Sequence, residues 1–328
     1  MNIRYLITLL LFACPIACLS LENNGFRAEL SHVDSKSNFT QTELLYRAAT
    51  RTKHRLSRIK HMQLFSSTNI SSNMHSEVPT LAEYYMDLAI GTPPLRYSAI
   101  ADTGRWTSGT LDKETFTFGI TKSVSVPNIT FGCSTSSSDD FNGSAGLVGL
   151  SRGELSLTSQ LNTGMFSYCL TSFFDTNSTS PLLLGPLAKF SGNTVKSTPF
   201  VKNPSRVPMN TYYYLSLQGI SLGTNNLAIQ PTAFALQSDG TGGFIIDSGT
   251  TFTLLVKEAY LAVKNAIQSI VKLPLADGSN VGFDLCYFVR SGSSPPGMPN
   301  LIFHFDSADM VLPVDNYMLV NFVMYMYY

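Results

Sequence analysis

Short apolar runs separated by turn residues fill the chain from about residue 83 onward. Each run is rich in β-branched and aromatic residues. The runs span residues 84–90, 97–101, 115–118, 129–131, 212–217, 244–246, 301–305 and 310–312. Many short strands at this spacing predict an all-β protein.

Two helices are expected within this β-rich region. Residues 154–161 predict a short helix, and residues 257–271 predict a longer one with a single apolar face that packs against the sheets. That face consists of Tyr260, Val263, Ile267, Ile270 and Val271.

A third helical pattern precedes the strands. Residues 43–63 carry the apolar positions Leu44, Leu45, Ala48, Leu56 and Ile59. Between them lie Arg47, Arg51, Lys53, Arg55, Arg58 and Lys60. This basic amphipathic helix is either a solvated helix or part of a pro-segment whose positive charge covers an acidic cleft.

The chain divides into four segments on this reading. Residues 1–20 have the charged start, short apolar run and small residues of a secretory signal, with a retained anchor as the alternative. Residues 21–76 read as a removable basic leader outside the fold, ending in an exposed linker at 66–76. A proline-rich stretch at 199–208 then separates an N-terminal lobe, 77–200, from a C-terminal lobe, 201–328. The two lobes start alike, at 83–88 and 211–217, which points to a duplicated architecture.

Charge and composition narrow the function. The 328 residues have 44% hydrophobic content and a formal net charge of zero. The leader carries eight basic and four acidic residues, whereas residues 77–328 carry thirteen and eighteen. An acidic body argues against nucleic acid as a partner. Secretion would make the sequons surface loops, at Asn38, Asn69, Asn128, Asn142 and Asn177.

Two turns in the chain have similar sequences, each with an aspartate that follows a β-prone run. Residues 242–255 place Asp247 after an apolar run and before Ser-Gly-Thr, and residues 97–104 place Asp102 before Thr-Gly. A buried carboxylate needs hydrogen-bond donors or a partner. We therefore expect Asp102 and Asp247 to face each other, sharing one proton so that the pair holds an acid and a base.

Other chemistries have little support. Only His304 lies in the predicted body, inside an apolar run, so a serine or cysteine nucleophile lacks its base. Neither zinc-site motifs nor a phosphate-binding loop occur. A glycosidase would need two unlike carboxylate environments, whereas the matching turns indicate symmetry. A shared-proton pair can activate water for peptide hydrolysis in acid.

These stretches resemble the pepsin-like aspartic proteases, and among them the plant nepenthesin-type group. The similar segments are residues 83–94, 101–104, 106–111, 114–119, 146–153, 166–170 and the Asp247 turn. The resemblance implies a bilobal all-β fold with one catalytic aspartate per lobe, Asp102 and Asp247. It also implies supporting roles for the turn residues Thr103, Gly104, Ser248, Gly249 and Thr250, a Cys133–Cys169 disulfide, and a pro-segment.

Two departures from the family pattern stand out. Gly104 runs directly into Arg105 and Trp106, so the insert and the flap tyrosine that follow the first triplet in the family have no match. The end is also short: Cys286 lacks its expected partner, the strand that closes around the second aspartate is missing, and residues 317–328 match nothing expected. Both lobes are therefore expected to be incomplete.

The sequence thus predicts a secreted aspartic endopeptidase with a pro-segment, acting on extended polypeptides without a cofactor. A monomer without a membrane span, in the apoplast or the vacuole, is expected. Two alternatives stay open: a catalytically inert binding protein of the same fold, as some plant relatives inhibit other hydrolases, and a truncated product that does not fold stably.

Overall fold

The computed structural model describes residues 6–7, 25–35, 37–65, 84–102, 108–119, 123–136, 144–172, 174–190, 195–207, 209–279, 283–289 and 297–319. Several predictions fall outside these residues. They concern Thr103, Gly104, Arg105, Trp106, the sequons at Asn69 and Asn142, the linker at 66–76 and most of the segment 1–20.

One large sheet forms the N-terminal half. Its eight strands run in the order β6-β5-β3-β2-β9-β8, with β4 pairing with both β3 and β7. The bounds are β2 Phe26–His32, β3 Tyr84–Ile90, β4 Leu95–Asp102, β5 Ser108–Phe118, β6 Val124–Ser136, β7 Leu147–Gly149, β8 Phe166–Tyr168 and β9 Thr179–Leu184. A short helix, α2 (Leu157–Gln160), covers only the second half of the predicted 154–161.

The leader contributes a strand to this sheet, which corrects the expectation that residues 21–76 lie outside the fold. β2 lies between β3 and β9, pairing Leu30 with Met86 on one side and Ala28 with Leu182 on the other. Ala28 and Leu30 are buried in the core of the sheet. The alternating polar and apolar residues of 26–32 suit a half-buried strand.

The C-terminal half is built on a second sheet, of order β12-β11-β17-β18. Its strands are β11 Leu217–Leu222, β12 Asn225–Asn226, β17 Leu301–Phe305 and β18 Ala308–Leu312. Three two-stranded pairs accompany it: β10 (Tyr213–Leu215) with β13 (Phe244–Ile246), β15 (Leu275–Ala276) with β16 (Cys286–Tyr287), and β1 (Leu6–Ile7) with β14 (Thr253–Leu254). Short 3-10 turns occur at Gly185–Ala188, Met209–Thr211, Pro231–Phe234 and Val314–Asn316.

Helix α3 (Lys257–Ile270) packs on the C-terminal sheet through an apolar face, as predicted. Tyr260, Val263 and Ile267 are buried there together with Val271, which caps the helix end. Ile270 is exposed instead, because at 3.6 residues per turn it lies at the edge of the face that the other four residues share.

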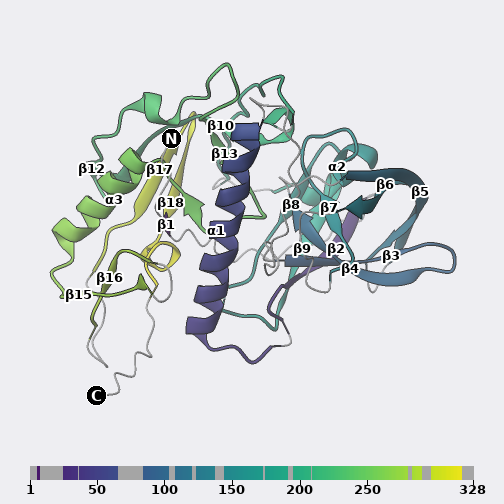
Figure 1. The fold of residues 1–328 in the computed structure, drawn as a ribbon, viewed down its shortest axis with the longest axis horizontal. Helices are drawn as coiled ribbons and strands as arrows, with labels where there is room; N and C mark the ends of the chain where they lie inside the picture. The colour runs from purple at the N-terminus through teal and green to yellow at the C-terminus, as the bar shows by residue number, and fades with distance from the viewer. Residues whose placement is uncertain are drawn as a thin grey trace.

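Helix α1 (Gln41–Phe65) of the leader runs between the two halves (Figure 1). It starts with a capping box, in which the Glu43 backbone N–H donates to Thr40 Oγ1 and the Thr40 N–H donates to the Glu43 carboxylate. Its first turns bury four apolar side chains against Phe252 of the C-terminal half. These are Leu44, Leu45, Ala48 and Ala49. The solvated-helix alternative is therefore wrong for this part of α1.

The described residues thus form two β-sheet halves with few helices, which confirms an all-β bilobal fold. Among the helices they contain, none has the length and apolarity to cross a membrane.

Candidate active site

Asp102 is the last residue of β4, and its side chain is only 1% exposed. β4 is held on one side by β3 and on the other by the parallel strand β7, which pairs Asp102 with Gly149. The Leu150 N–H donates to the Asp102 carbonyl at 2.9 Å. Residues 146–150 therefore close around the first aspartate, as the resemblance implies.

Asp247 follows β13 and is 8% exposed at its side chain. The turn after it supplies donors: the Gly249 N–H lies 3.0 Å from Oδ1, and Thr250 Oγ1 lies 2.7 Å from Oδ2. Among the described residues, β13 pairs only with β10. Asp247 thus keeps its local turn, while the strand expected to close around it is not seen there.

A hydrogen-bond path connects the two aspartate turns. Tyr213 of β10 pairs with Ile246, which directly precedes Asp247. The Tyr213 hydroxyl donates to the Leu150 carbonyl at 2.8 Å, and Leu150 in turn holds the backbone of Asp102. The two halves are therefore tied together immediately beside both carboxylates.

Arg55 of α1 brings the carboxylates together. Its Nη1 lies 2.7 Å from Asp102 Oδ2, and its Nη2 lies 3.0 Å from Asp102 Oδ1 and 2.7 Å from Asp247 Oδ2. The Arg55 side chain is 5% exposed. One guanidinium thus forms a bidentate pair with one aspartate and bridges to the other, a geometry that suits arginine and not lysine.

The charges around Arg55 shift its pKa and that of a neighbouring phenol. Burial opposes the charge of Arg55, but Asp102 and Asp247 more than offset it and raise its pKa above the ordinary value. Burial also raises the pKa of Tyr212 to about 12, with Arg55 acting in the opposite direction. Arg55 therefore stays charged at every accessible pH.

A second phenol near the dyad, that of Tyr168, also has a raised pKa. Burial, with Asp247 as the next cause, raises its pKa to about 12. The dyad region is therefore lined by phenols that stay neutral over the physiological range.

Gly249 is required by close packing across the site. A β-carbon added at this position would overlap the Asp102 carboxylate, so the second turn lies directly against the first aspartate. The structure therefore brings together Asp102, Asp247, Gly249 and Thr250, with Ser248 in the same turn. Thr103 and Gly104 lie outside the described residues.

Comparisons with known proteins agree with this arrangement. Aspartic proteinase nepenthesin-1 of Nepenthes gracilis is 37% identical over an alignment that covers 90% of this chain and 80% of the relative. Nepenthesin-2 of the same species is 36% identical, with 90% and 79% covered. The chain belongs to the plant nepenthesin-type, pepsin-like aspartic proteases.

Family models and solved structures match as well. Residues 104–186 match the model described as xylanase inhibitor N-terminal, and residues 212–322 match xylanase inhibitor C-terminal. The structure titled "Crystal structure of edgp" matches with TM-score 0.59 and 17% identity, covering 73% of this chain and 80% of that one. Basic 7S globulin from soybean matches with TM-score 0.56 and 15% identity, covering 72% and 80%. At these identities the structures show the fold alone.

The length of the nepenthesin-1 alignment is relevant to the family segments that are expected to be missing from this chain. It extends over 359 positions, more than the 328 residues of this chain, so the relative contains residues without a counterpart here. This agrees with segments that are absent relative to the family.

The predicted disulfide is not formed, which corrects the expectation for Cys133 and Cys169. Cys133 lies on β6 with a free, exposed thiol. Cys169 follows β8, and β6 and β8 are the opposite edges of the eight-stranded sheet. Because β6 and β8 do not pair with each other, strand pairing does not place the two cysteines side by side.

His304 lies in strand β17, as predicted, and is the middle member of a hydrogen-bonded row of three side chains. Its Nε2 lies 2.9 Å from Ser221 Oγ, and its Nδ1 lies 2.8 Å from Asp309 Oδ1. The connectivity is that of a serine-hydrolase triad. Ser221 is 2% exposed on the inner part of the sheet, so a substrate cannot reach its hydroxyl, and the row is a cross-strand polar network.

Arg55 is the residue at the site that sequence reasoning did not single out. It was only one of six basic positions in the predicted helix. The spacing of Arg47, Arg51 and Arg55 at intervals of four is the signal that distinguishes it, because such residues share one helix face.

Proposed function

We propose that this chain is a latent aspartic endopeptidase in which Asp102 and Asp247 are the catalytic dyad. The observation that carries the proposal is Arg55, whose single guanidinium contacts both buried carboxylates. Two acids that one guanidinium bridges are close enough to share a proton once the arginine leaves. One then acts as a base toward water, and the other as an acid toward the substrate carbonyl.

The leader would hold this dyad inactive. With Arg55 in place both carboxylates are paired, so neither water nor a peptide carbonyl can occupy the same space. Displacement of α1, which carries Arg55, would then open a cleft for an extended polypeptide between the lobes 77–200 and 201–328, while the leader strand β2 stays paired in the sheet.

The turn residues would support the reaction. Thr250 and the Gly249 N–H hold Asp247 in one orientation through the bonds described above. By the family resemblance, Thr103 and Ser248 would contribute hydroxyls across the dyad, and Gly104 and Gly249 would allow the tight turns. Residues 1–20 would direct the chain into the secretory pathway, toward the apoplast or the vacuole.

The second candidate is an inert binding protein of the same fold. It is favoured by the two family models, both described as parts of a xylanase inhibitor, and by the single strand partner of β13 among the described residues. Such a protein would bind its partner without turnover.

Cleavage of an unfolded protein separates the two candidates. The purified chain is incubated at acid pH with denatured casein, beside an Asp247→Asn variant that keeps the side-chain size. The endopeptidase proposal expects new internal peptides from the wild-type chain and none from the variant. Equal rates from both proteins would exclude it.

A further inference from the structure

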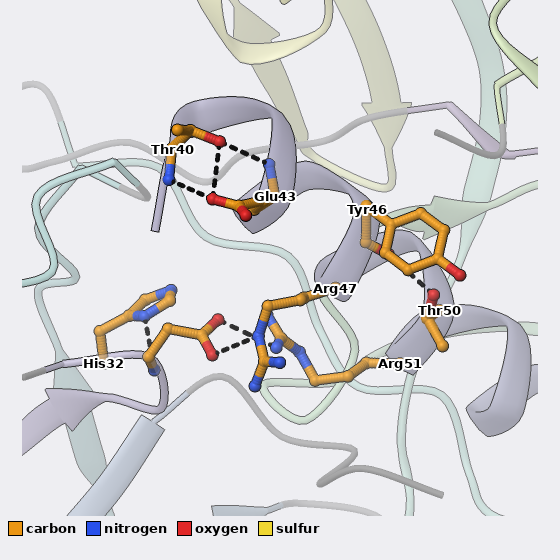
Figure 2. A network of polar contacts seen from close by, with 8 residues as sticks. His32, Thr40, Glu43, Tyr46, Arg47, Thr50 and Arg51 are labelled. Atoms are coloured by element: carbon orange, nitrogen blue, oxygen red, sulfur yellow. Dashed lines mark hydrogen bonds and ion pairs between the residues drawn. The ribbon is translucent and has the colours of Figure 1, made fainter. Parts of the chain in front are cut away.

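Three arginines of α1 lie on one face of the helix. Arg47, Arg51 and Arg55 are spaced by four residues, and residues at that spacing project from the same side. Arg55 binds the two dyad carboxylates. The other two bind Asp34 of the leader: Arg47 Nε lies 2.7 Å from Oδ1, and Arg51 Nη1 lies 3.0 Å from Oδ2. Figure 2 shows the side chains of Arg47 and Arg51 turned toward the same carboxylate.

This Asp34 cluster is buried and tightly connected. The side chains of Asp34 and Arg51 are 1% and 2% exposed, and Arg47 also lies over the Phe39 ring at 4.5 Å. The Asp34 backbone N–H donates to His32 Nδ1 at 3.1 Å, at the end of β2. A buried charge is costly without its partner, so the carboxylate and the two arginines hold one another in place.

Asp34 is attached to the sheet that carries Asp102. It follows β2, which pairs with β3, and β3 pairs with β4, whose last residue is Asp102. The position of Asp34 relative to Asp102 is therefore set by ladder hydrogen bonds. Since a helix rises about 1.5 Å per residue, Arg55 lies about 6 Å along the axis beyond Arg51. Fixing Arg51 at Asp34 thus fixes where Arg55 reaches the dyad.

We infer that Asp34 is the positioning residue for latency: by holding Arg47 and Arg51, it sets the axial position of α1 that places the Arg55 guanidinium between Asp102 and Asp247. The inference deepens the proposed function and rests on it for its biological meaning. The inference predicts that helix α1 and the contact between Arg55 and the dyad open together. Loss of the Asp34 carboxylate should then free Arg55, although Asp34 and Arg55 do not bind each other.

The groups that face Asp34 come from two elements: Arg47 and Arg51 from α1, and His32 from β2, with Tyr84 of β3 edge-on to the His32 ring at 5.7 Å. Both side-chain oxygens of Asp34 are therefore paired with α1, and its backbone N–H is tied to β2.

Hydrogen–deuterium exchange tests the inference without any need for catalysis. Uptake is followed in the full chain for peptides within 44–56 and, as a reference, within 217–222 and 301–305. Asp34→Asn is expected to increase helix opening at least tenfold at neutral pH, while the reference strands stay protected. Asp112→Asn, an exposed acid on β5, is the matched control and should change neither.

A double-variant cycle separates positioning from general destabilisation. If Asp34 acts through Arg55, the two substitutions Asp34→Asn and Arg55→Met together should open α1 by clearly less than the product of their separate effects, whereas full multiplication would mean independent structural roles and would overturn the inference. If Asp34→Asn also exposes the reference strands, the Arg47→Gln variant is measured in its place. The Arg47 side chain is 29% exposed, so its replacement disturbs the core less than that of Asp34. A threefold or larger opening of α1 alone supports the inference, and no opening overturns it.

The endopeptidase proposal can fail separately. If α1 opens as expected but neither the wild-type chain nor any variant cleaves denatured casein, the proposed activity is wrong and the role of Asp34 in placing Arg55 stands.

Discussion

Replacing Arg55 by methionine should release the leader helix at neutral pH. Methionine keeps much of the length and apolar contact of the arginine stem but removes the guanidinium that contacts Asp102 and Asp247. The variant leaves two buried carboxylates side by side. One of them can take up a proton, so the site tolerates the change while losing its attachment to α1.

The size of the change in the opening equilibrium of α1 follows from the burial and the hydrogen-bond geometry of Arg55. The guanidinium is 5% exposed and makes three short charge-assisted hydrogen bonds. Breaking a buried ion pair by removing one partner costs about 3–5 kcal/mol, which corresponds to roughly a hundredfold to a few thousandfold in the opening equilibrium of α1. Since part of that cost is relieved when a carboxylate takes up a proton, we expect the lower end.

The charge of Arg55 is present at neutral pH. Asp102 and Asp247 raise the pKa of Arg55 above its ordinary value, so the stabilisation that this charge contributes is present throughout the accessible range and would be lost only as pH rises through that raised value. Wild type and variant should therefore differ strongly at neutral pH.

Limited trypsin digestion measures this opening. Trypsin cuts after the basic residues of α1 only when the helix is open, so at low protease concentration the cleavage rate follows the opening equilibrium. Lys53→Met, an exposed position on the same helix, is the control. Equal cleavage rates for wild type, Arg55→Met and the control at neutral pH would refute the reasoning that Arg55 holds the leader.

Four further predictions concern the dyad region and the Cys286 thiol. Gly249→Ala should abolish acid cleavage of casein and lower the melting temperature, since its β-carbon would overlap the first carboxylate; unchanged activity would contradict this packing. Tyr213→Phe should lower stability by about 1 kcal/mol in urea unfolding, because it removes one hydrogen bond between the halves. In ultraviolet titration, Tyr168 and Tyr212 should ionise near pH 12, and the stability that their neutral forms contribute should be full below about pH 10 and fall as pH rises toward about 12. Burial raises the pKa of the Cys286 thiol, so iodoacetamide at about pH 8 should modify it more slowly than a cysteine in an unfolded peptide.

Much of the strand pattern could be predicted because the apolar runs are local signals. The predicted 84–90, 244–246 and 301–305 coincide with β3, β13 and β17. β5 and β6 are much longer than the predicted 115–118 and 129–131. Their outer parts are polar and are stabilised by pairing with each other, which no local pattern reveals.

Long-range pairing explains most of what sequence reasoning missed. The leader strand β2 was assigned to a removable segment because its charge and position set it apart, while its place between β3 and β9 depends on partners far along the chain. The disulfide expectation failed for the same reason, since strand order decides that Cys133 and Cys169 lie at opposite edges. Conversely, Asp102 and Asp247 could be paired in advance because each turn carries an aspartate, a hydroxyl residue and a glycine in that order.

The central claim is that Asp102 and Asp247 act as one unit in peptide hydrolysis, and single and double substitutions test it most directly. Initial rates of casein cleavage at acid pH are compared for the wild-type chain, Asp102→Asn, Asp247→Asn and the double variant. Groups that act as a unit are non-additive, so the account predicts that each single variant loses as much activity as the double variant. Substantial activity in either single variant, or a wild-type rate no higher than that of the double variant, would contradict it.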